Sequence, residues 1–393
     1  MVRVVGIDPG TTSFDLCGIA GERLILDESI PTAQVIADPQ TLVERLASVA
    51  PVELVLGPSG YGLPWVPLSQ MEKRELDLAL LSYRRERGRD TIIGGMRELL
   101  TTLQETDLPI LFAPAVIHLP TVPAHRKANR IDMGTADKLC AAALGVYDQA
   151  RHLDITYEET SFVYVELGGA FTAILAVDGG QIVDGIGGSA GPLGYRALGG
   201  MDGELAYLLD SFPKGTLCSG GVADIAGQPE AKPETLIAQA GGDPHSRLAW
   251  EAFFEGLVKG VAAEMTVVAP REILLSGRLC RVPELYRQIA SRLAAFAPVR
   301  RVNGFAQTAK EAAQGAALIA EGLAGGIHAG LVETMRLREA SGTVLDHLYV
   351  RGADALRQQY QVRRTLGGVT TCKSTASRSR THSPRRSRCA PPG

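Results

Sequence analysis

The stretch of sequence that decides the fold is GIDPGTTSFD, residues 6–15. An apolar strand ends in the acid Asp8, and the chain turns at Gly10 into two hydroxyl residues, Thr11 and Thr12. Hydroxyl and backbone N–H groups in such a turn donate hydrogen bonds to phosphate oxygens, and Mg²⁺ prefers carboxylate and water oxygens. The pattern predicts a phosphate-binding turn with Asp8 facing a metal ion. An ordinary β-hairpin with Pro-Gly turn chemistry is the alternative.

This motif recurs later in the chain. VVGIDPGTTSFDLCGIAGERL superposes on VYVELGGAFTAILAVDGGQI at a constant offset of 158 residues, so Asp8 falls on Glu166 and Gly10 on Gly168. Each copy places an acid and a glycine turn between its first two strands, where main-chain N–H groups approach a phosphate closely. We therefore predict that Gly168 and Gly169 form a second phosphate turn. Chance similarity between short apolar strands is the alternative.

The order of strands and helices also repeats. Three strands, a helix and a strand begin the chain, and three strands begin again at SFVYVEL. This order predicts an α/β protein with a lobe over residues 1–160, a second lobe over 161–360 and a cleft between them. From residue 361 the composition shifts to Ser, Thr, Arg, Pro and Gly, which predicts a basic disordered tail over 361–393. That tail is either an arm for RNA or an acidic partner, or dispensable.

Composition and charge exclude several classes. Of the 393 residues, 45% are apolar and 21% charged, as in globular proteins. The net charge is -3 although the tail is basic, so the body is acidic and we expect it not to bind nucleic acid. No apolar run long enough for a membrane helix and no signal pattern occur, which predicts a cytoplasmic protein without membrane contact. The six cysteines form no CxxC pair, which argues against a metal or disulfide framework.

The two copies resemble the phosphate motifs of the actin, hexokinase and Hsp70 superfamily of ATPases. EILLSGRL, residues 272–279, resembles the strand and turn that lie on adenosine in these proteins, and KEAAQGAALIAEGL resembles their cleft-closing helix. The resemblance covers residues 2–325 and implies a duplicated ribonuclease-H-like fold with ATP and Mg²⁺ between the lobes. The sequence departs from the superfamily pattern at Glu166, where Asp is usual, and at Ser276-Gly277-Arg278, where a glycine pair is usual.

The resemblance assigns roles to residues of this chain. The metal-facing acids are Asp8 and Glu166. The nucleotide-binding residues are Gly10, Thr11, Thr12, Gly168, Gly169, Ser276, Gly277 and Arg278.

Within the superfamily the second half most resembles the acetate and butyrate kinases. The whole chain is similar to a family of uncharacterised proteins described as predicted butyrate kinases (DUF1464). These resemblances imply a kinase that phosphorylates a small metabolite, such as a short-chain carboxylate, to an acyl phosphate.

The competing class is an ATP-hydrolysing regulator or activator. Such activators usually bind an iron-sulfur cluster through cysteine pairs, which this chain lacks. A third class, an actin-like filament protein, would require long surface insertions, which this compact chain lacks. Relatives commonly pair, so a homodimer is possible.

RIDMGTADKLCAAALG carries the acceptor hypothesis. Thr135 is expected to cap a helix whose first turn holds Asp137 and Lys138. The segment resembles the helix start of type III pantothenate kinases, which implies that Asp137 acts near the acceptor as a base or positioning group. The alternative is an acid that only favours the helix dipole.

A carboxylate acceptor changes what the site must supply. It is already an anion near pH 7, so it needs cations rather than a base. We predict that Arg196, with Arg130 or Arg126, binds it and shields the transferred phosphoryl group. Solvated surface arginines are the alternative.

Overall fold

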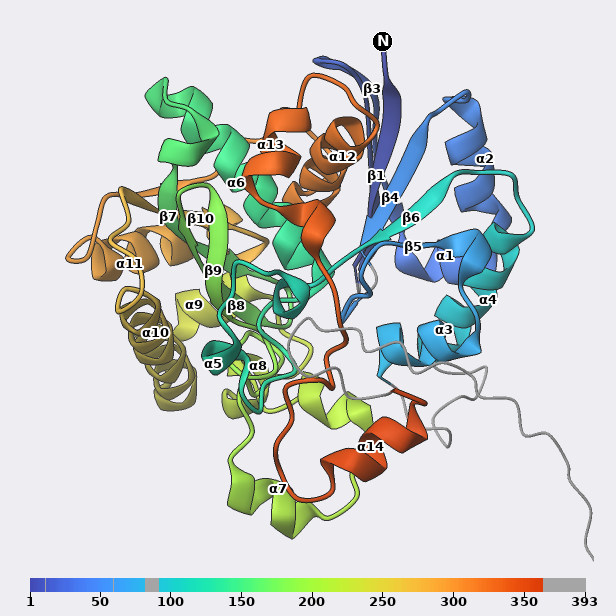
Figure 1. The fold of residues 1–393 in the computed structure, drawn as a ribbon. Helices are drawn as coiled ribbons and strands as arrows, with labels where there is room; N and C mark the ends of the chain where they lie inside the picture. The colour runs from blue at the N-terminus through green and yellow to red at the C-terminus, as the bar shows by residue number, and fades with distance from the viewer. Residues whose placement is uncertain (11, 59, 82–91, 363–393) are drawn as a thin grey trace, which may run out of the picture.

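The computed structural model describes residues 1–10, 12–58, 60–81 and 92–362. Two mixed sheets form two lobes, with helices between and around them (Figure 1). The first sheet has the order β3-β2-β1-β4-β6-β5 and the second β11-β10-β7-β8-β9. The strands are β1 Arg3–Pro9, β2 Ser13–Ala20, β3 Arg23–Pro31, β4 Leu54–Pro58, β5 Val66–Pro67, β6 Ile110–Ala113, β7 Ser161–Leu167, β8 Thr172–Asp178, β9 Gln181–Ile186, β10 Glu272–Ser276 and β11 Val299–Arg301.

The strand pairing confirms the duplication. In the first sheet Val4 pairs with Ile19 across the β1–β2 hairpin, and in the second Phe162 pairs with Val177 across β7–β8. Each pair in the second sheet stands 158 residues beyond its counterpart in the first. The register shift after Gly18 between β2 and β3 also recurs, after Ala176 between β8 and β9. A shared register and a shared irregularity exclude a chance similarity of apolar strands.

Two helices lie between the sheets and join the lobes: α6 Ala136–Leu153 and α12 Glu311–Leu323 (Figure 1). They pack closely because glycines stand at the contacts. Between the helices, a Cβ atom on Gly315 of α12 would lie 1.7 Å from the carbonyl oxygen of Cys140 in α6. Between α6 and the second sheet, a Cβ atom on Gly145 would lie 2.9 Å from the Phe162 ring of β7. The two helices therefore form a shared layer across which both lobes meet.

The residues after the second sheet return to the first sheet. A Cβ atom on Gly6 of β1 would lie 2.2 Å from the carbonyl oxygen of Ala313, so α12 packs directly on the first sheet. Further along, the Trp65 indole N–H donates to the carbonyl of Leu337. Many apolar side chains of residues 309–362 are buried in the same cluster as the core of the first sheet.

The remaining helices lie around the two lobes (Figure 1). They are α1 Thr32–Ala37, α2 Gln40–Ser48, α3 Lys73–Leu80, α4 Ile92–Gln104, α5 Ala124–Lys127, α7 Gly203–Leu209, α8 Val222–Ile225, α9 Pro233–Gln239, α10 Pro244–Glu264, α11 Pro283–Leu293, α13 Ala329–Thr334 and α14 Ala353–Gln359. Among the described residues, no helix combines the length and apolar character that crossing a membrane requires. The predicted tail lies outside the described residues from residue 363 onward.

Candidate nucleotide and phosphotransfer site

A pocket of about 640 Å³ opens between the lobes, where β1 and β7 end. Ligands of open α/β folds bind in the crevice beyond the carboxyl ends of the strands, so this pocket is where a ligand is expected. Ten of the predicted site residues line it: Asp8, Gly10, Thr12, Asp137, Glu166, Gly168, Gly169, Ser276, Gly277 and Arg278. Thr11 lies outside the described residues.

The two predicted phosphate turns have little room for side chains. The Gly10 N–H donates to the carbonyls of Asp8 and Ser13, and a Cβ atom on Gly10 would lie 2.9 Å from the Ser13 oxygen. A Cβ atom on Gly168 would lie 3.0 Å from the carbonyl oxygen of Phe171. Glycine at both turns lets the main chain approach a ligand closely.

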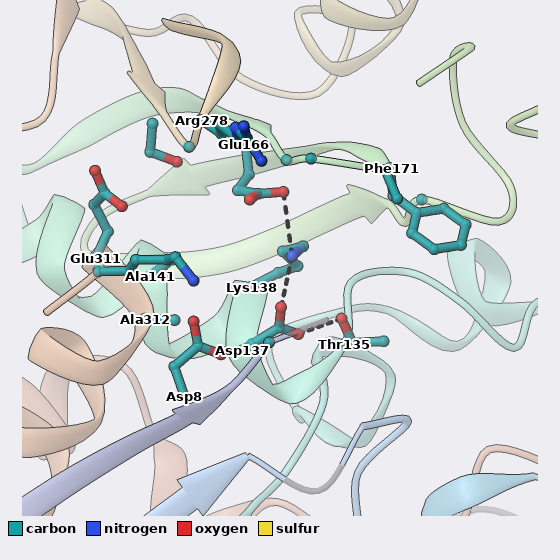
Figure 2. Close-up of a pocket in the computed structure, with 18 of the residues that line it drawn as sticks. Asp8, Thr135, Asp137, Lys138, Ala141, Glu166, Phe171, Arg278, Glu311 and Ala312 are labelled. Atoms are coloured by element: carbon teal, nitrogen blue, oxygen red, sulfur yellow. Dashed lines mark hydrogen bonds and ion pairs between the residues drawn. The ribbon is translucent and has the colours of Figure 1, made fainter. Parts of the chain in front are cut away.

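An ammonium group joins the acids of the two lobes inside the pocket. The Lys138 Nζ atom lies 2.5 Å from Oδ2 of Asp137 and 3.1 Å from Oε2 of Glu166 (Figure 2). Asp137 also accepts a hydrogen bond from the Thr135 hydroxyl. Burial alone would raise the pKa of Asp137, but Lys138 and Thr135 lower it. Asp137 is therefore an ionised carboxylate with a defined orientation.

Burial shifts the neighbouring groups in different directions. The pKa of Asp8 is raised to about 7 by burial and by the charge of Asp137, although Lys138 and Lys310 oppose the shift. Burial also raises the pKa of Glu166, against the effect of Lys138. Burial disfavours the Lys138 cation, yet Asp137 and Glu166 raise its pKa overall. The site thus has an excess of negative charge that a bound cation would relieve.

Lys310 is a pocket residue that the sequence did not single out. Its Nζ atom lies 2.7 Å from Oδ2 of the buried Asp15 and 2.6 Å from the Ser13 hydroxyl. The loop before it is anchored by Asp27, whose carboxylate accepts the N–H groups of Gln307, Thr308 and Ala309. The signal was its place at the start of the helix that resembles the cleft-closing helix. Its approach to the Gly10 turn depends on the packing of α12 against β1.

Loop residues form another part of the pocket wall that sequence reasoning missed. Tyr61 and Phe171 line it together with Asp132 and Ser189. Asp132 is buried and accepts hydrogen bonds from the N–H of Gly134 and from the N–H and hydroxyl of Ser189. Burial and the charge of Asp132 raise the pKa of Tyr61 to about 12, so this phenol stays neutral. These residues come from separate loops and form no local motif.

The family model described as "Protein of unknown function (DUF1464)" matches residues 6–350. The chain belongs to the DUF1464 family. No curated protein matches its sequence.

Solved structures share the fold of this DUF1464 chain. A propionate kinase from Francisella tularensis subsp. tularensis SCHU S4 has a TM-score of 0.55 and 16% identity, over 80% of this chain and 99% of that one. An acetate kinase from Entamoeba histolytica has a TM-score of 0.53 and 11% identity, over 75% and 86%. An acetate kinase from Porphyromonas gingivalis has a TM-score of 0.51 and 12% identity, over 75% and 88%. The DUF1464 chain thus shares the duplicated two-lobed fold of these three kinases.

The predicted acceptor arginines do not line the pocket of the DUF1464 chain. Arg196 donates to the carbonyl of Pro229 at 3.0 Å and is exposed, and Arg130 is also exposed. Arg126 donates to the carbonyl of Val183 and lies 3.6 Å from Asp184. The structure therefore does not bring these three arginines together with the residues that line the pocket.

The residues present fit a hydrated Mg²⁺ ion and a nucleotide. Within the described part of the chain, no three His, Cys, Asp or Glu side chains converge closely enough to hold a metal ion by themselves. Mg²⁺ usually takes one or two carboxylates and keeps several waters, which Asp8 and Glu166 suit as oxygen donors. The glycine turns leave space for the phosphates. The pocket volume lies in the range usual for small ligands and cofactors.

Proposed function

We propose that this DUF1464 protein is a phosphotransferase that uses ATP and Mg²⁺ to phosphorylate a small metabolite. One observation carries the proposal: both copies of the acid-glycine motif face a single pocket, with Lys138 between Asp137 and Glu166. Duplicated phosphate turns that converge from two lobes suit a polyphosphate ligand.

Each part of the pocket binds a different part of the nucleotide. The phosphates of ATP lie along the turns at Gly10 and Gly168, and the adenosine lies near Ser276, Gly277 and Arg278. Mg²⁺, when bound near Asp8 and Glu166, neutralises charge on the phosphates. The other contributions to catalysis come from side chains of the protein.

Catalysis then consists of positioning and electrostatic stabilisation. Lys310 and Lys138 place ammonium groups near the transferred phosphoryl group, where negative charge is shared among oxygens in the transition state. The carboxylate of Asp137 orients the acceptor. Closure of the lobes excludes water, so that ATP is not hydrolysed.

The resemblance to acetate and butyrate kinases implies a short-chain carboxylate, such as butyrate, as the acceptor. The arginines predicted to bind such a carboxylate, Arg196 and Arg130, do not line the pocket. An ATP-hydrolysing regulator of the same superfamily is the other outcome that the experiment below distinguishes.

The first experiment measures ADP release from Mg-ATP by the purified protein, with and without a panel of small acceptors. We expect slow basal turnover and strong stimulation by an acceptor. Asp8→Ala should abolish the Mg²⁺-dependent turnover while circular dichroism shows an intact fold. Glu251→Gln, an exposed acid on α10, is the matched control and should behave as the wild type. Full activity in Asp8→Ala would refute the site, and turnover indifferent to every acceptor would favour the regulator.

A further inference from the structure

We propose that the acceptor is a neutral molecule phosphorylated on a hydroxyl group, such as a polyol or sugar, and that Asp137 positions this hydroxyl and accepts its proton. The inference rests on the proposed function and specifies its substrate class. It departs from the carboxylate that the resemblance implies.

The arrangement of residues along the pocket indicates where the acceptor binds. Arg278 and Glu311 lie on one side of the close-up, Thr135 and Phe171 lie on the other, and Lys138 lies between them (Figure 2). The adenosine turn contains Arg278, so the phosphates extend toward Lys138. The acceptor therefore lies beyond Asp137, at the end lined by Thr135 and Phe171. Gly188 lies against the Phe171 side chain, and the next residue, Ser189, lies beside Asp132 and Tyr61. We call this part of the pocket, with Tyr61, Asp132 and Ser189, the acceptor end.

The cations that line the pocket are largely neutralised by acids. Lys138 is paired with two carboxylates, Lys310 with Asp15, and Arg281 with Glu311 at 3.2 Å. The remaining lining cation, Arg278, stands at the opposite side from the acceptor end. Among the described residues, then, the acceptor end has no lysine or arginine of its own.

One cation touches the outer wall of the acceptor end but is already engaged. Lys214 lies 4.6 Å from the centre of the Tyr61 ring and donates to the carbonyls of Leu80 and Leu81 at the end of α3. It does not line the pocket. It is therefore not positioned to pair with a bound carboxylate.

The acceptor end contains a buried anion instead. Asp132 takes its hydrogen bonds from Gly134 and Ser189, and a Cβ atom on Gly187 would lie 1.7 Å from its Oδ1 atom. The carboxylate is thus held tightly beside the acceptor end. With Asp137 nearby, it repels a second carboxylate, because charges interact strongly where water is scarce. The hydroxyls of Tyr61 and Ser189 can instead exchange hydrogen bonds with a hydroxylated ligand.

The chemistry of transfer also gives Asp137 a task. The acceptor oxygen forms a bond to the γ-phosphorus, and the bond from that phosphorus to the β–γ bridging oxygen breaks. ADP leaves with the electron pair, and the hydroxyl proton passes to the Asp137 carboxylate and then to water. A carboxylate acceptor has no proton to lose, so it would make no such use of Asp137.

The test compares acceptors that differ in the reacting group. Purified protein is incubated with Mg-[γ-³²P]ATP and with glycerol, erythritol, glucose or 1-butanol, against acetate, propionate and butyrate. Products are then treated with neutral hydroxylamine, which converts acyl phosphates to hydroxamates and leaves phosphate esters intact. We expect at least a tenfold stimulation by a hydroxyl compound and a product that resists hydroxylamine. Hydroxamate formation, or stimulation by carboxylates alone, would overturn the inference.

Failure of the proposed function has a separate signature, because Mg-ATP binding is measured by calorimetry in the same samples. Absence of binding refutes the kinase itself; binding without stimulation by any hydroxyl compound refutes only the acceptor class. Asp137→Asn should lower kcat with the hydroxyl acceptor at least 100-fold while leaving the Kd for Mg-ATP within about twofold. Glu251→Gln again serves as the control. An unchanged kcat in Asp137→Asn would remove its proposed role.

Discussion

Lys138 and Glu166 connect the two lobes across the pocket, with the Lys138 Nζ atom 3.1 Å from Oε2 of Glu166. Lys138 stands in the first turn of α6, and Glu166 stands near the end of β7. Each position is local in origin, but their contact exists only because α6 packs beside the second sheet. The pair links the duplicated motif to the transfer chemistry.

Replacement of Lys138 should destabilise the protein as well as inactivate it. Lys138→Met takes the cation away from Asp137 and Glu166, whose side chains are 26% and 16% exposed. Loss of one member of a fully buried ion pair costs about 3 to 5 kcal/mol and of an exposed pair less than about 1 kcal/mol, so this partly buried group should lose about 2 kcal/mol. We expect this loss in the free energy of unfolding, measured by urea denaturation. Lys259→Met removes an exposed pair with Glu255 and should change it by less than about 1 kcal/mol. Equal effects of the two variants would contradict the buried role.

The contact between α6 and α12 should not tolerate a methyl group. Gly315→Ala places a Cβ atom 1.7 Å from the carbonyl oxygen of Cys140, so the helices must separate. Overpacking of this kind lowers the free energy of unfolding by about 2 kcal/mol or more. Gly203→Ala is the matched control, because no atom lies within 4 Å of the added methyl in α7. Thermal unfolding should show a clear loss in the first variant and none in the second.

Glu264 should make stability fall as pH rises. Burial and the nearby charge of Asp184 raise the pKa of Glu264 to about 8, with Arg126 opposing. The folded state therefore retains a proton that the unfolded state has lost above its ordinary pKa of 4.5. This contribution is complete below about pH 4.5 and is lost as pH rises through 8. Glu264→Gln should thus melt at a higher temperature than the wild type at pH 9 and at a similar one at pH 5. If the exposed Glu251→Gln showed the same gain, general charge effects would explain it.

The anchor at Asp27 should control Lys310 indirectly. Burial would raise the pKa of Asp27, but the N–H groups of Ala309, Gln307 and Thr308 lower it. Asp27→Asn substitutes an amide that has one oxygen in place of two. We expect the free energy of unfolding to fall by about 1 to 2 kcal/mol and the Kd for Mg-ATP to rise several-fold. Calorimetry with Mg-ATP measures the second effect; an unchanged Kd would show that Lys310 does not bear on the nucleotide.

Much of the architecture follows from local sequence. The hairpin after Asp8 and its copy at Glu166 could be predicted because strand alternation and turn glycines act over a few residues. The 158-residue offset then made the duplication visible without any knowledge of contacts. Asp137 could be singled out because its segment resembles the helix start of type III pantothenate kinases.

Tertiary structure decided the rest. Arg196 and Arg130 looked suited to an anion, but the place of a long side chain depends on the backbone around it, and neither lines the pocket. Asp132 and Ser189 meet at the acceptor end although 57 residues separate them in sequence. Sequence pattern determines which segments become strands, helices and turns, because those preferences are local. Which charges share a pocket depends on packing between distant segments, and that packing sets the chemistry the pocket can perform.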